Sequence, residues 1–319
     1  AFVNVCKTWN VPCYIERSRS GNGAHAWIFF DTPVTAFKAR KLGNAILTEA
    51  MSCDAHLSFK SYDRFFPNQD TLPKGGLGNL VALPLQGMAR RKGNSVFVDE
   101  DFNAYADQWK MLSQIHKLSE VELDLLLQLH AVPTLGELSK TCEEKPWEIS
   151  HMDAAQSEDY PKQIVLTRAN MLYVPLASLS AKCVNVFKRI AAFRNPEFYE
   201  KQGMRLSTYN IPRIISCSEM TDDYLALPRG CEDAVSSILT QHGVKVAISD
   251  KTNHGHNINV TFRGSLREGQ QNAMEAFAGH NIGTLSATTA FGKTVFAIGM
   301  LARRKVNTLI LVHNKALLE

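Results

Sequence analysis

Residues 287–294 combine the residue types and spacing of a phosphate-binding loop, with the sequence Ala-Thr-Thr-Ala-Phe-Gly-Lys-Thr. In such a loop, successive backbone N–H groups and the N-terminus of the following helix hold the phosphate oxygens. Lys293 would place a positive charge at the β- and γ-phosphates, Thr294 could ligate Mg²⁺, and Gly292 would let the backbone approach the phosphates. The predicted ATP site therefore comprises Ala287, Thr288, Thr289, Ala290, Phe291, Gly292, Lys293 and Thr294.

This loop needs a strand before it and a helix after it. Residues 283–287, Gly-Thr-Leu-Ser-Ala, are predicted to form a short buried strand, and apolar residues at helical spacing over 294–304 indicate a helix. Residues 307–313 are predicted to form another strand. A Gly-Lys-Thr tripeptide can also occur by chance in a turn, and it is the flanking elements that favour phosphate binding.

Residues 266–270, Leu-Arg-Glu-Gly-Gln, precede the loop and are followed by a helical pattern. The segment resembles the adenine-reading motif of superfamily 2 helicases, which implies that Gln270 hydrogen-bonds the base. Residues 307–313 resemble the strand that leads into the first DNA-contacting motif of that family. A helicase motor also needs an acidic Walker B motif and a second RecA-like lobe, and the sequence contains neither. We therefore expect at most weak ATP binding, and no turnover, from this chain alone.

A second chemically suggestive stretch lies near the N-terminus. Residues 11–16 and 24–30 alternate like two strands, and the polar loop at 17–23 joins them into a hairpin. The hairpin would bring an imidazole, hydroxyls and arginines to one surface that could hold a triphosphate. A single histidine on a strand is more often structural, so the spacing alone leaves both interpretations open. The residues of this candidate nucleotide site are Ser18, Arg19, Ser20, Gly23 and His25.

Residues 16–30, Glu-Arg-Ser-Arg-Ser-Gly-Asn-Gly-Ala-His-Ala-Trp-Ile-Phe-Phe, resemble the second motif of archaeo-eukaryotic primases. The histidine of that motif contacts the incoming nucleotide, which implies a catalytic role for His25. Residues 61–70 resemble the third motif, in which an aspartate after a hydrophobic residue binds metal. The resemblance implies that Asp63 is this catalytic metal ligand.

Two alternatives to this assignment stay open. Asp70 is a less favoured choice of metal ligand than Asp63, and Asp-Arg clusters often do no more than shape turns. Lys74 follows in a glycine-bearing segment, where it could contact the phosphates of a nucleotide.

Together these segments resemble the primase-polymerase module of the conflict-system proteins called TOTE, fused to a superfamily 2 helicase. The resemblance implies nucleotidyl transfer, with nucleoside triphosphates as substrates, Mg²⁺ or Mn²⁺ as cofactor, and DNA or RNA as partner. Other conflict-system proteins are further possible partners. The first primase motif, a pair of metal-binding carboxylates, is expected upstream of residue 1. Because two-metal transfer needs those carboxylates, we expect the chain alone to be inactive.

Two other functions are compatible with the sequence. The parent protein could be a DNA translocase of the restriction type, whose primase-like half binds nucleic acid without catalysis. It could also be a P-loop ATPase unrelated to nucleic acid, in which case the hairpin match would be a coincidence.

The composition is that of an ordinary globular protein: of 319 residues, 45% are hydrophobic and 21% charged. A net charge of +4 is compatible with nucleic-acid binding but indicates it only weakly. Seven cysteines without a C-x-x-C pair argue against a zinc ribbon and a disulfide framework. We predict no membrane segment and no signal peptide, and hence reduced cysteines in a cytoplasmic protein.

The predicted fold class is α/β, in four parts. An α+β primase-like domain of the RRM type spans 1–130, a linker spans 131–163, a small α/β module that contacts DNA spans 164–264, and the start of a RecA-like P-loop domain spans 265–319. Residues 194–213 interleave basic and aromatic side chains, which fits either a single-strand grip or a solvated loop with buried rings. Other expected elements are strands at 80–85 and 164–174, a β-pair of 245–248 with 257–262, and a helix at 33–51 capped by Asp31 or Thr32.

Overall fold

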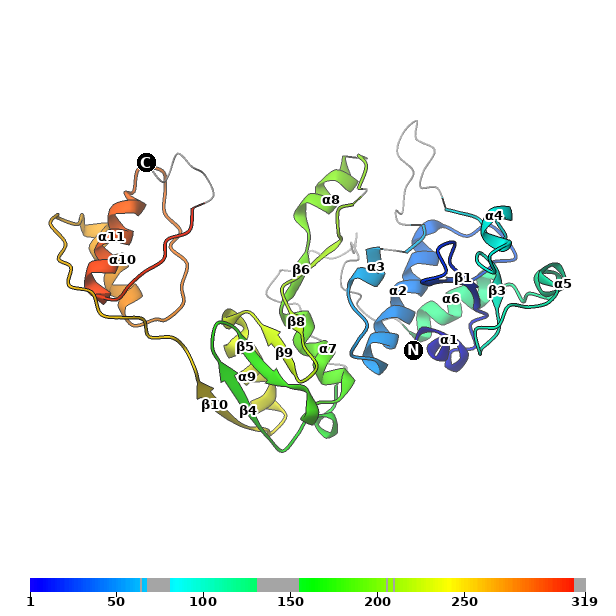
Figure 1. Cartoon of the computed structure of the whole chain (residues 1–319), viewed down its shortest axis with the longest axis horizontal. Coiled ribbons are helices and arrows are strands. Elements are labelled where there is room, and N and C mark those ends of the chain that lie inside the picture. The colour runs from blue at the N-terminus through cyan, green and yellow to red at the C-terminus, as the bar shows by residue number, and fades with distance from the viewer. Residues whose placement is uncertain (64, 68–80, 131–154, 205, 209, 313–319) are drawn as a thin grey trace.

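The computed structural model of the chain describes residues 1–63, 65–67, 81–130, 155–204, 206–208 and 210–312, and for residues 62 and 63 it describes the backbone alone. Figure 1 shows three groups of elements in chain order: α1 to α6, then β4 to β10 with their helices, then α10 and α11. The chain is a mixed α/β protein, as predicted. Most of the predicted linker, 131–154, lies outside the described residues.

The N-terminal group surrounds a small antiparallel sheet with strand order β2-β1-β3. Its elements are α1 (Phe2–Thr8), β1 (Tyr14–Arg17), β2 (Ala24–Trp27), α2 (Ala36–Cys53), α3 (Lys60–Asp63), α4 (Gly87–Arg90), β3 (Phe97–Val98), α5 (Gln108–Ser113) and α6 (Glu120–Leu129). The strand predicted at 80–85 is wrong for the described residues 81–85, which form no strand.

Helix α2 supplies part of the hydrophobic core of this group. Leu42, Ile46 and Ala50 recur at helical spacing and are buried in one apolar cluster with Leu118 and Leu123. The predicted caps Asp31 and Thr32 are wrong. Thr35 caps the helix instead, because its hydroxyl accepts a hydrogen bond from the Lys38 N–H, an unpaired donor of the first turn.

The middle group contains a five-stranded sheet with strand order β10-β4-β5-β9-β8. Its elements are β4 (Gln163–Arg168), β5 (Leu172–Pro175), α7 (Ala181–Ile190), β6 (Ala192–Arg194), α8 (Pro196–Gly203), β7 (Ile214–Ser216), β8 (Glu219–Met220), β9 (Tyr224–Leu227), α9 (Glu232–Gln241) and β10 (Lys245–Asp250), with short 3₁₀ turns at Ser157–Asp159, Leu176–Ser178 and Arg229–Cys231. The core includes Leu166 and Val174 of the sheet, Phe187 of α7 and Leu239 of α9.

Two sequence-based expectations for this sheet are wrong. The single strand expected at 164–174 is a hairpin, because the chain bends at 169–171 and β4 and β5 pair antiparallel. The strand at 245–250 pairs in parallel with β4 rather than with 257–262, which places Val246 beside Ile164. A parallel partner cannot be deduced from a short apolar run, because the run does not state its direction in the sheet.

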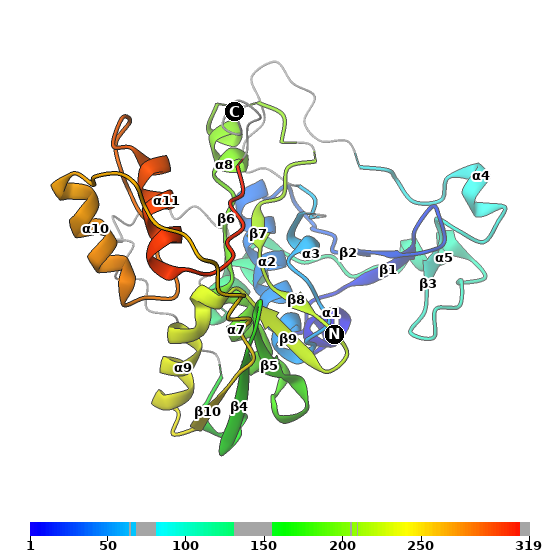
Figure 2. The same ribbon diagram turned by 60° about the vertical axis from the view of Figure 1, so that its left-hand side comes forward.

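Strands β6 and β7 with helix α8 form an arm that extends from the middle group (Figures 1 and 2). Phe198 is buried, and the guanidinium carbon of Arg213 lies 4.6 Å from the centroid of its ring. The guanidinium carbon of Arg194 lies 5.7 Å from the centroid of the Tyr199 ring. Several cations and rings of this stretch thus stack on one another within the arm.

Helix α7 of the middle group packs against α2 of the N-terminal group. The ammonium group of Lys188 donates hydrogen bonds to the carbonyl oxygens of Ala55 and Leu57, which follow the end of α2, and burial lowers the pKa of Lys188. Ile214 at the root of the arm packs in one cluster with Met51 of α2. The middle group is therefore joined to the N-terminal group by apolar and polar contacts.

The C-terminal group contains α10 (Glu268–Ala278) and α11 (Lys293–Arg304), which pack through an edge-on contact of Phe277 with Phe296. The helix predicted after the candidate loop is confirmed. The strands predicted at 283–287 and 307–313 are wrong for the described residues 283–287 and 307–312. A strand requires a hydrogen-bonded neighbour, and in the described part of the chain this region forms one isolated bridge, between Asn257 and Val306.

None of the helices that the structure describes combines the length and the apolar composition that a membrane-spanning helix requires. The six cysteines within the described ranges are all free thiols.

Candidate functional site

The hairpin of β1 and β2 sets the register of the first candidate site. Glu16 lies directly opposite His25 on β2, and on the other side of β1 it lies opposite Phe97 of β3. Residues directly opposite each other in an antiparallel pair project from the same face of the sheet. The sheet therefore brings the Glu16 carboxylate and the His25 imidazole together.

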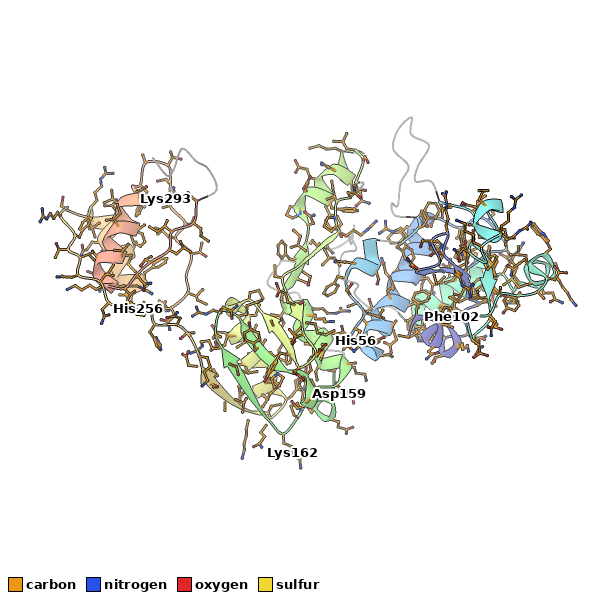
Figure 3. The ribbon with its side chains drawn as sticks, viewed as in Figure 1. His56, Phe102, Asp159, Lys162, His256 and Lys293 are labelled. Carbon is orange, nitrogen blue, oxygen red and sulfur yellow. The ribbon has the colours of Figure 1, made fainter. Side chains whose placement is uncertain are left out.

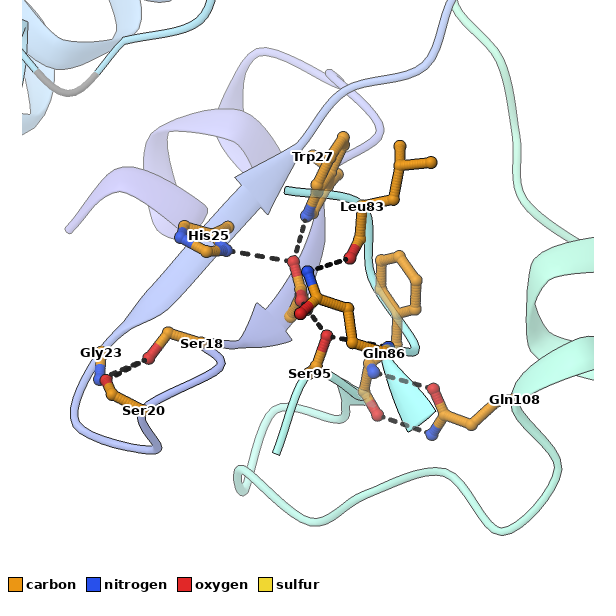
Figure 4. A network of polar contacts seen from close by, with 11 residues as sticks. Ser18, Ser20, Gly23, His25, Trp27, Leu83, Gln86, Ser95 and Gln108 are labelled. Carbon is orange, nitrogen blue, oxygen red and sulfur yellow. Dashed lines mark hydrogen bonds and ion pairs between the residues drawn. The ribbon is translucent and has the colours of Figure 1, made fainter. Parts of the chain in front are cut away.

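The carboxylate of Glu16 is the centre of a polar network (Figure 4). Its Oε2 accepts hydrogen bonds from His25 Nδ1 at 3.0 Å and from Trp27 Nε1 at 2.9 Å, and its Oε1 accepts one from Ser95 Oγ at 3.1 Å. Glu16 is only 2% exposed, whereas the His25 side chain is 51% exposed. A buried carboxylate thus holds a half-exposed imidazole at the surface.

The Glu16 contact fixes which nitrogen of His25 carries a proton. A carboxylate only accepts hydrogen bonds, so Nδ1 must be the donor toward Glu16. Nε2 is then the ring atom available to a ligand: it accepts a hydrogen bond in the neutral ring and donates one in the charged ring. This is the arrangement by which proteins orient a functional histidine through its second nitrogen.

The loop between β1 and β2 is closed by its own hydrogen bonds. The Ser18 N–H donates to the Gly23 carbonyl oxygen at 2.8 Å, and the Gly23 N–H donates to Ser18 Oγ at 3.1 Å. Ser20 Oγ lies 3.2 Å from Ser18 Oγ and accepts from the Asn22 N–H at 3.3 Å. Gly21 has a φ of +81°, a conformation that favours glycine. Ser18, Ser20 and Gly23 therefore shape the turn that leads into His25.

Arg19 is exposed at the tip of this loop. The neighbouring Arg17 donates hydrogen bonds to the carbonyl oxygens of Gly93 and Phe102, and thereby ties the hairpin to two other loops. Of the two arginines in the hairpin, Arg19 alone is thus presented to solvent without such a bond among the described residues.

The predicted metal ligand Asp63 ends helix α3, and its side chain lies outside the described part of the structure. Asp70 and Lys74 also lie outside the described residues. Among the side chains that are described, no three His, Cys, Asp or Glu converge as a metal site. The oxygens of Glu16 are already hydrogen-bonded within the fold. Because the side chain of Asp63 lies outside the described residues, the predicted metal site stays a prediction.

Sequence reasoning missed Glu16, Ser95 and Gln108. Gln108 closes the outer edge of β3, because its side-chain amide accepts from the Phe97 N–H at 2.8 Å and donates to the Phe97 carbonyl oxygen at 2.9 Å. A signal for Glu16 was present: it is one of the few acidic residues within the predicted strands, and a hairpin closed around 17–24 places it opposite His25. No comparable signal marks Ser95 or Gln108, which come from distant segments.

The second candidate site, residues 287–294, lies in the C-terminal group, where Lys293 begins helix α11 (Figure 3). The Lys293 ammonium donates a hydrogen bond to the Thr288 carbonyl oxygen of the same loop at 2.9 Å. Gly292 caps the helix with a φ of +87°, a conformation that favours glycine. Thr294 follows in the first turn of the helix and Ala287 precedes the turn at Thr289 and Ala290.

Gln270 is 3% exposed and reaches this loop from α10. Its side-chain Oε1 accepts from the Arg267 N–H at 2.9 Å, and its Nε2 donates to the carbonyl oxygens of Phe291 at 2.7 Å and Gly292 at 3.4 Å. The amide group is thus engaged on both sides by the backbone, and it links the helix before the loop to the loop itself.

The two sites can perform different chemistry. The hairpin presents an oriented imidazole that can bind a phosphate oxygen or transfer a proton. The loop presents a lysine and a helix N-terminus, which together suit a phosphate group.

Residues 1–126 match the family model of the TOTE conflict system archaeo-eukaryotic primase domain. A search of curated proteins found no match. The matched range contains Glu16, His25 and Asp63, and it confirms the primase resemblance for this part of the chain. Because the match ends before residues 287–294, the helicase part stays a prediction.

Proposed function

We propose that residues 1–126 bind a nucleoside triphosphate at the β1–β2 hairpin and serve nucleic-acid-related nucleotidyl transfer in a conflict system. The observation that carries this proposal is the hydrogen bond from His25 to the buried Glu16 within a domain that matches an archaeo-eukaryotic primase. A half-exposed histidine held by a buried carboxylate suits a residue that must meet a ligand in a fixed orientation.

In this proposal the Nε2 atom of His25 binds an oxygen of the triphosphate. Trp27 and Ser95 hold Glu16 in place, and Glu16 holds the ring, so that the imidazole loses little conformational freedom when the nucleotide binds. Arg19 at the loop tip would add a charge-assisted contact to the phosphates.

Divalent metal would neutralise the phosphates and activate the attacking hydroxyl when it is bound. Asp63 is our proposed ligand from this chain, and Mg²⁺ or Mn²⁺ the proposed ion. DNA or RNA is the proposed partner nucleic acid. In the alternative, the primase-like half binds nucleic acid without catalysis. It would then keep its contacts to nucleic acid, and His25 would bind no nucleotide.

The test is an equilibrium titration of the 319-residue chain with a fluorescent nucleoside triphosphate in Mg²⁺ or Mn²⁺. The Lys293→Ala background removes the second candidate site from the signal. His25→Ala should weaken binding by about tenfold, which corresponds to one lost hydrogen bond to a charged group. His56→Ala, which removes an exposed histidine of the same domain, should leave the affinity unchanged. Equal affinity of the His25→Ala variant and its parent would contradict the proposal.

A second nucleotide site at residues 287–294 is supported by the position of Lys293 at the start of α11 and by the left-handed Gly292. We propose that this loop binds the phosphates of ATP, with Thr294 beside the metal ion, as part of a superfamily 2 helicase that drives DNA unwinding or translocation. In a His25→Ala background, Lys293→Ala should abolish the remaining ATP binding. The exposed Lys305→Ala, at the other end of the same helix, should not change ATP binding. An unchanged ATP affinity in the Lys293→Ala variant would refute the assignment.

A further inference from the structure

A group of basic side chains gathers beside the tip of the hairpin. Arg19 belongs to the hairpin loop, and Arg90, Arg91 and Lys92 lie at the end of α4 and in the turn that follows it. No sequence motif connects the two segments, which are separated by most of the N-terminal group.

Backbone pairing brings these two segments into contact. The Arg17 N–H donates to the Val96 carbonyl oxygen at 2.8 Å, and the Ser95 N–H donates to the Arg17 carbonyl oxygen at 2.9 Å. The pairing continues β1 alongside the chain that follows Lys92. A Cβ atom added to Gly21 would lie 2.9 Å from Asn94 Oδ1, so the loop tip touches the end of the basic turn.

The four cations are exposed and not neutralised within the described structure. Arg19, Arg90, Arg91 and Lys92 are all exposed, and in the described residues none of them forms an ion pair. Other cations of the chain behave differently. Lys38 pairs with Glu120 and Asp124, and Arg168 pairs with Glu232 and lowers the pKa of that carboxyl group.

The loop that carries Phe102, an exposed aromatic residue, is tied to the end of the basic turn. The Arg17 guanidinium donates to the Gly93 carbonyl oxygen at 2.8 Å and, through its other terminal nitrogen, to the Phe102 carbonyl oxygen. One side chain thus joins the end of the basic turn to the loop of Phe102. Figure 3 labels Phe102 in the N-terminal group, to which α4 and β3 also belong (Figure 1).

Phe102 is held in an unfavourable backbone conformation with its ring in solvent. Its φ is +61°, which is uncommon for a bulky residue, and its side chain is 59% exposed. The Asp99 carboxylate accepts hydrogen bonds from the N–H groups of Asp101 and Asn103 and so fixes the turn. Strained residues that the surrounding fold over-determines are frequent at binding sites.

We propose that Arg19, Arg90, Arg91, Lys92 and Phe102 form a binding surface for single-stranded nucleic acid, here called the basic–aromatic surface. Its cations would neutralise backbone phosphates, and the Phe102 ring would stack on an unpaired base. Inside a duplex the faces of each base are covered by the neighbouring base pairs, whereas a single strand can expose them, so the exposed ring favours a single strand. The same hairpin turn carries Arg19 and leads into His25. A nucleic-acid strand bound to Arg19 would therefore lie next to the proposed nucleotide site. The inference deepens the proposed function, because it names the nucleic acid that would bind beside the nucleotide site. Binding of a single strand to this surface does not itself require nucleotide binding at His25.

The first test measures the salt dependence of binding with the full 319-residue chain and a labelled oligothymidylate, by fluorescence anisotropy without nucleotide. The triple variant Arg90→Ala, Arg91→Ala, Lys92→Ala should bind more weakly. Its slope of log affinity against log salt should be shallower by up to about 2, because each phosphate contact on a single strand contributes about 0.7. The matched control Lys110→Ala, Lys117→Ala, Lys162→Ala removes three exposed cations that lie outside this surface and outside the module predicted to contact DNA. We expect it to retain the parent slope.

The second test isolates the ring. Phe102→Gly removes the aromatic side chain and relieves the positive φ, so the loop keeps its conformation. Affinity for oligothymidylate should fall by about tenfold, with the salt slope unchanged, because stacking involves no ion release. Phe37→Ala, which truncates an exposed ring of helix α2, serves as the control and should bind like the parent.

The outcomes separate this inference from the proposed function. The basic–aromatic surface is not a single-strand site if the slope of log affinity against log salt changes equally in the basic triple variant and in the lysine control. The same conclusion follows if Phe102→Gly binds oligothymidylate like the parent. The inference would also be overturned if a duplex bound as tightly as the single strand and Phe102→Gly did not weaken that binding. Nucleoside triphosphate binding in the same triple variant reports on His25 independently. Loss of oligonucleotide binding with retained nucleotide binding is the result we predict.

Discussion

The hairpin of β1 and β2 and the loop at 287–294 each present a side chain suited to phosphate, but they hold it in different ways. His25 is oriented by Glu16, a buried carboxylate on the neighbouring strand, so its second nitrogen is left for a ligand. Lys293 is held by the Thr288 carbonyl oxygen of its own loop. A nucleotide at the hairpin would meet a prepared group, whereas a nucleotide at the loop would have to replace an internal hydrogen bond.

The difference lies in what supports each site. The hairpin belongs to a three-stranded sheet, in which the register fixes the partner of every side chain. The loop follows an extended segment, 283–287, that has no strand partner in the described part of the chain, and it depends on Gln270 for its attachment to α10. Changes at the hairpin should therefore affect the stability of the whole N-terminal group, and changes at the loop should remain local.

The largest effect is expected from Glu16→Ala. The variant removes the acceptor of three hydrogen bonds at a buried position, so the free energy of unfolding of the N-terminal group should fall by about 3 kcal/mol. Chemical denaturation followed by tryptophan fluorescence, to which Trp9, Trp27 and Trp109 of the N-terminal group contribute, measures this loss. Glu100→Ala, at an exposed carboxylate paired with Lys7, should have a much smaller effect. A Glu16→Ala variant as stable as the parent would remove the distinction between the two sites.

A smaller and local effect is expected from Gln270→Ala. Loss of the bond to the Phe291 carbonyl oxygen should make the amides of residues 288–293 exchange with solvent about tenfold faster, while the hairpin amides keep their rates. Hydrogen exchange followed by mass spectrometry measures both regions in one sample.

Nucleotide discrimination decides the role of Gln270 at this loop. If Gln270 acts by holding the loop, Gln270→Ala weakens ATP and GTP binding to the same degree. Selective loss of ATP binding would instead favour the adenine-reading role that the sequence resemblance implies.

The smallest effect is expected from Gly292→Ala. An alanine at a φ of +87° is strained by about 1 kcal/mol, and its Cβ would lie 2.6 Å from Gln270 Nε2. Limited proteolysis at α11 should accelerate. Gly279→Ala, where φ is −86° and no atom lies within 4 Å of the added Cβ, is the matched control and should be neutral. Equal cleavage of both variants and the parent would show that the loop tolerates a side chain.

The sequence predicted the hairpin well, because alternating apolar residues on both sides of a polar, glycine-bearing loop have few other solutions. Helices α2 and α11 were also predicted, since their apolar residues recur at helical spacing. At the start of α6, Ser119 and Glu122 form a capping box between residues three positions apart. These features depend on residues that are close together in the chain.

Features that depend on distant residues were not predicted. Strand β10 was assigned the wrong partner because an apolar run does not specify which strand lies beside it. The Ser95 hydroxyl reaches Glu16 across 79 positions of the chain, because the backbone of Arg17 pairs with Ser95 and Val96. The basic–aromatic surface belongs to this second class, since the segments that carry its residues come together only when β1 pairs with the chain before β3.

The central claim is that Glu16 holds His25 so that Nε2 can bind a nucleotide, and nitrogen-detected NMR of the histidine side chains tests it most directly. The spectra compare the ¹⁵N-histidine-labelled chain with and without nucleoside triphosphate, with His25→Ala to assign the signals and Glu16→Gln to test the support. We predict that the His25 Nε2 resonance shifts on nucleotide addition, that Nδ1 stays protonated, and that the shift weakens in Glu16→Gln. Saturating nucleotide with no change at His25 Nε2 would contradict the account.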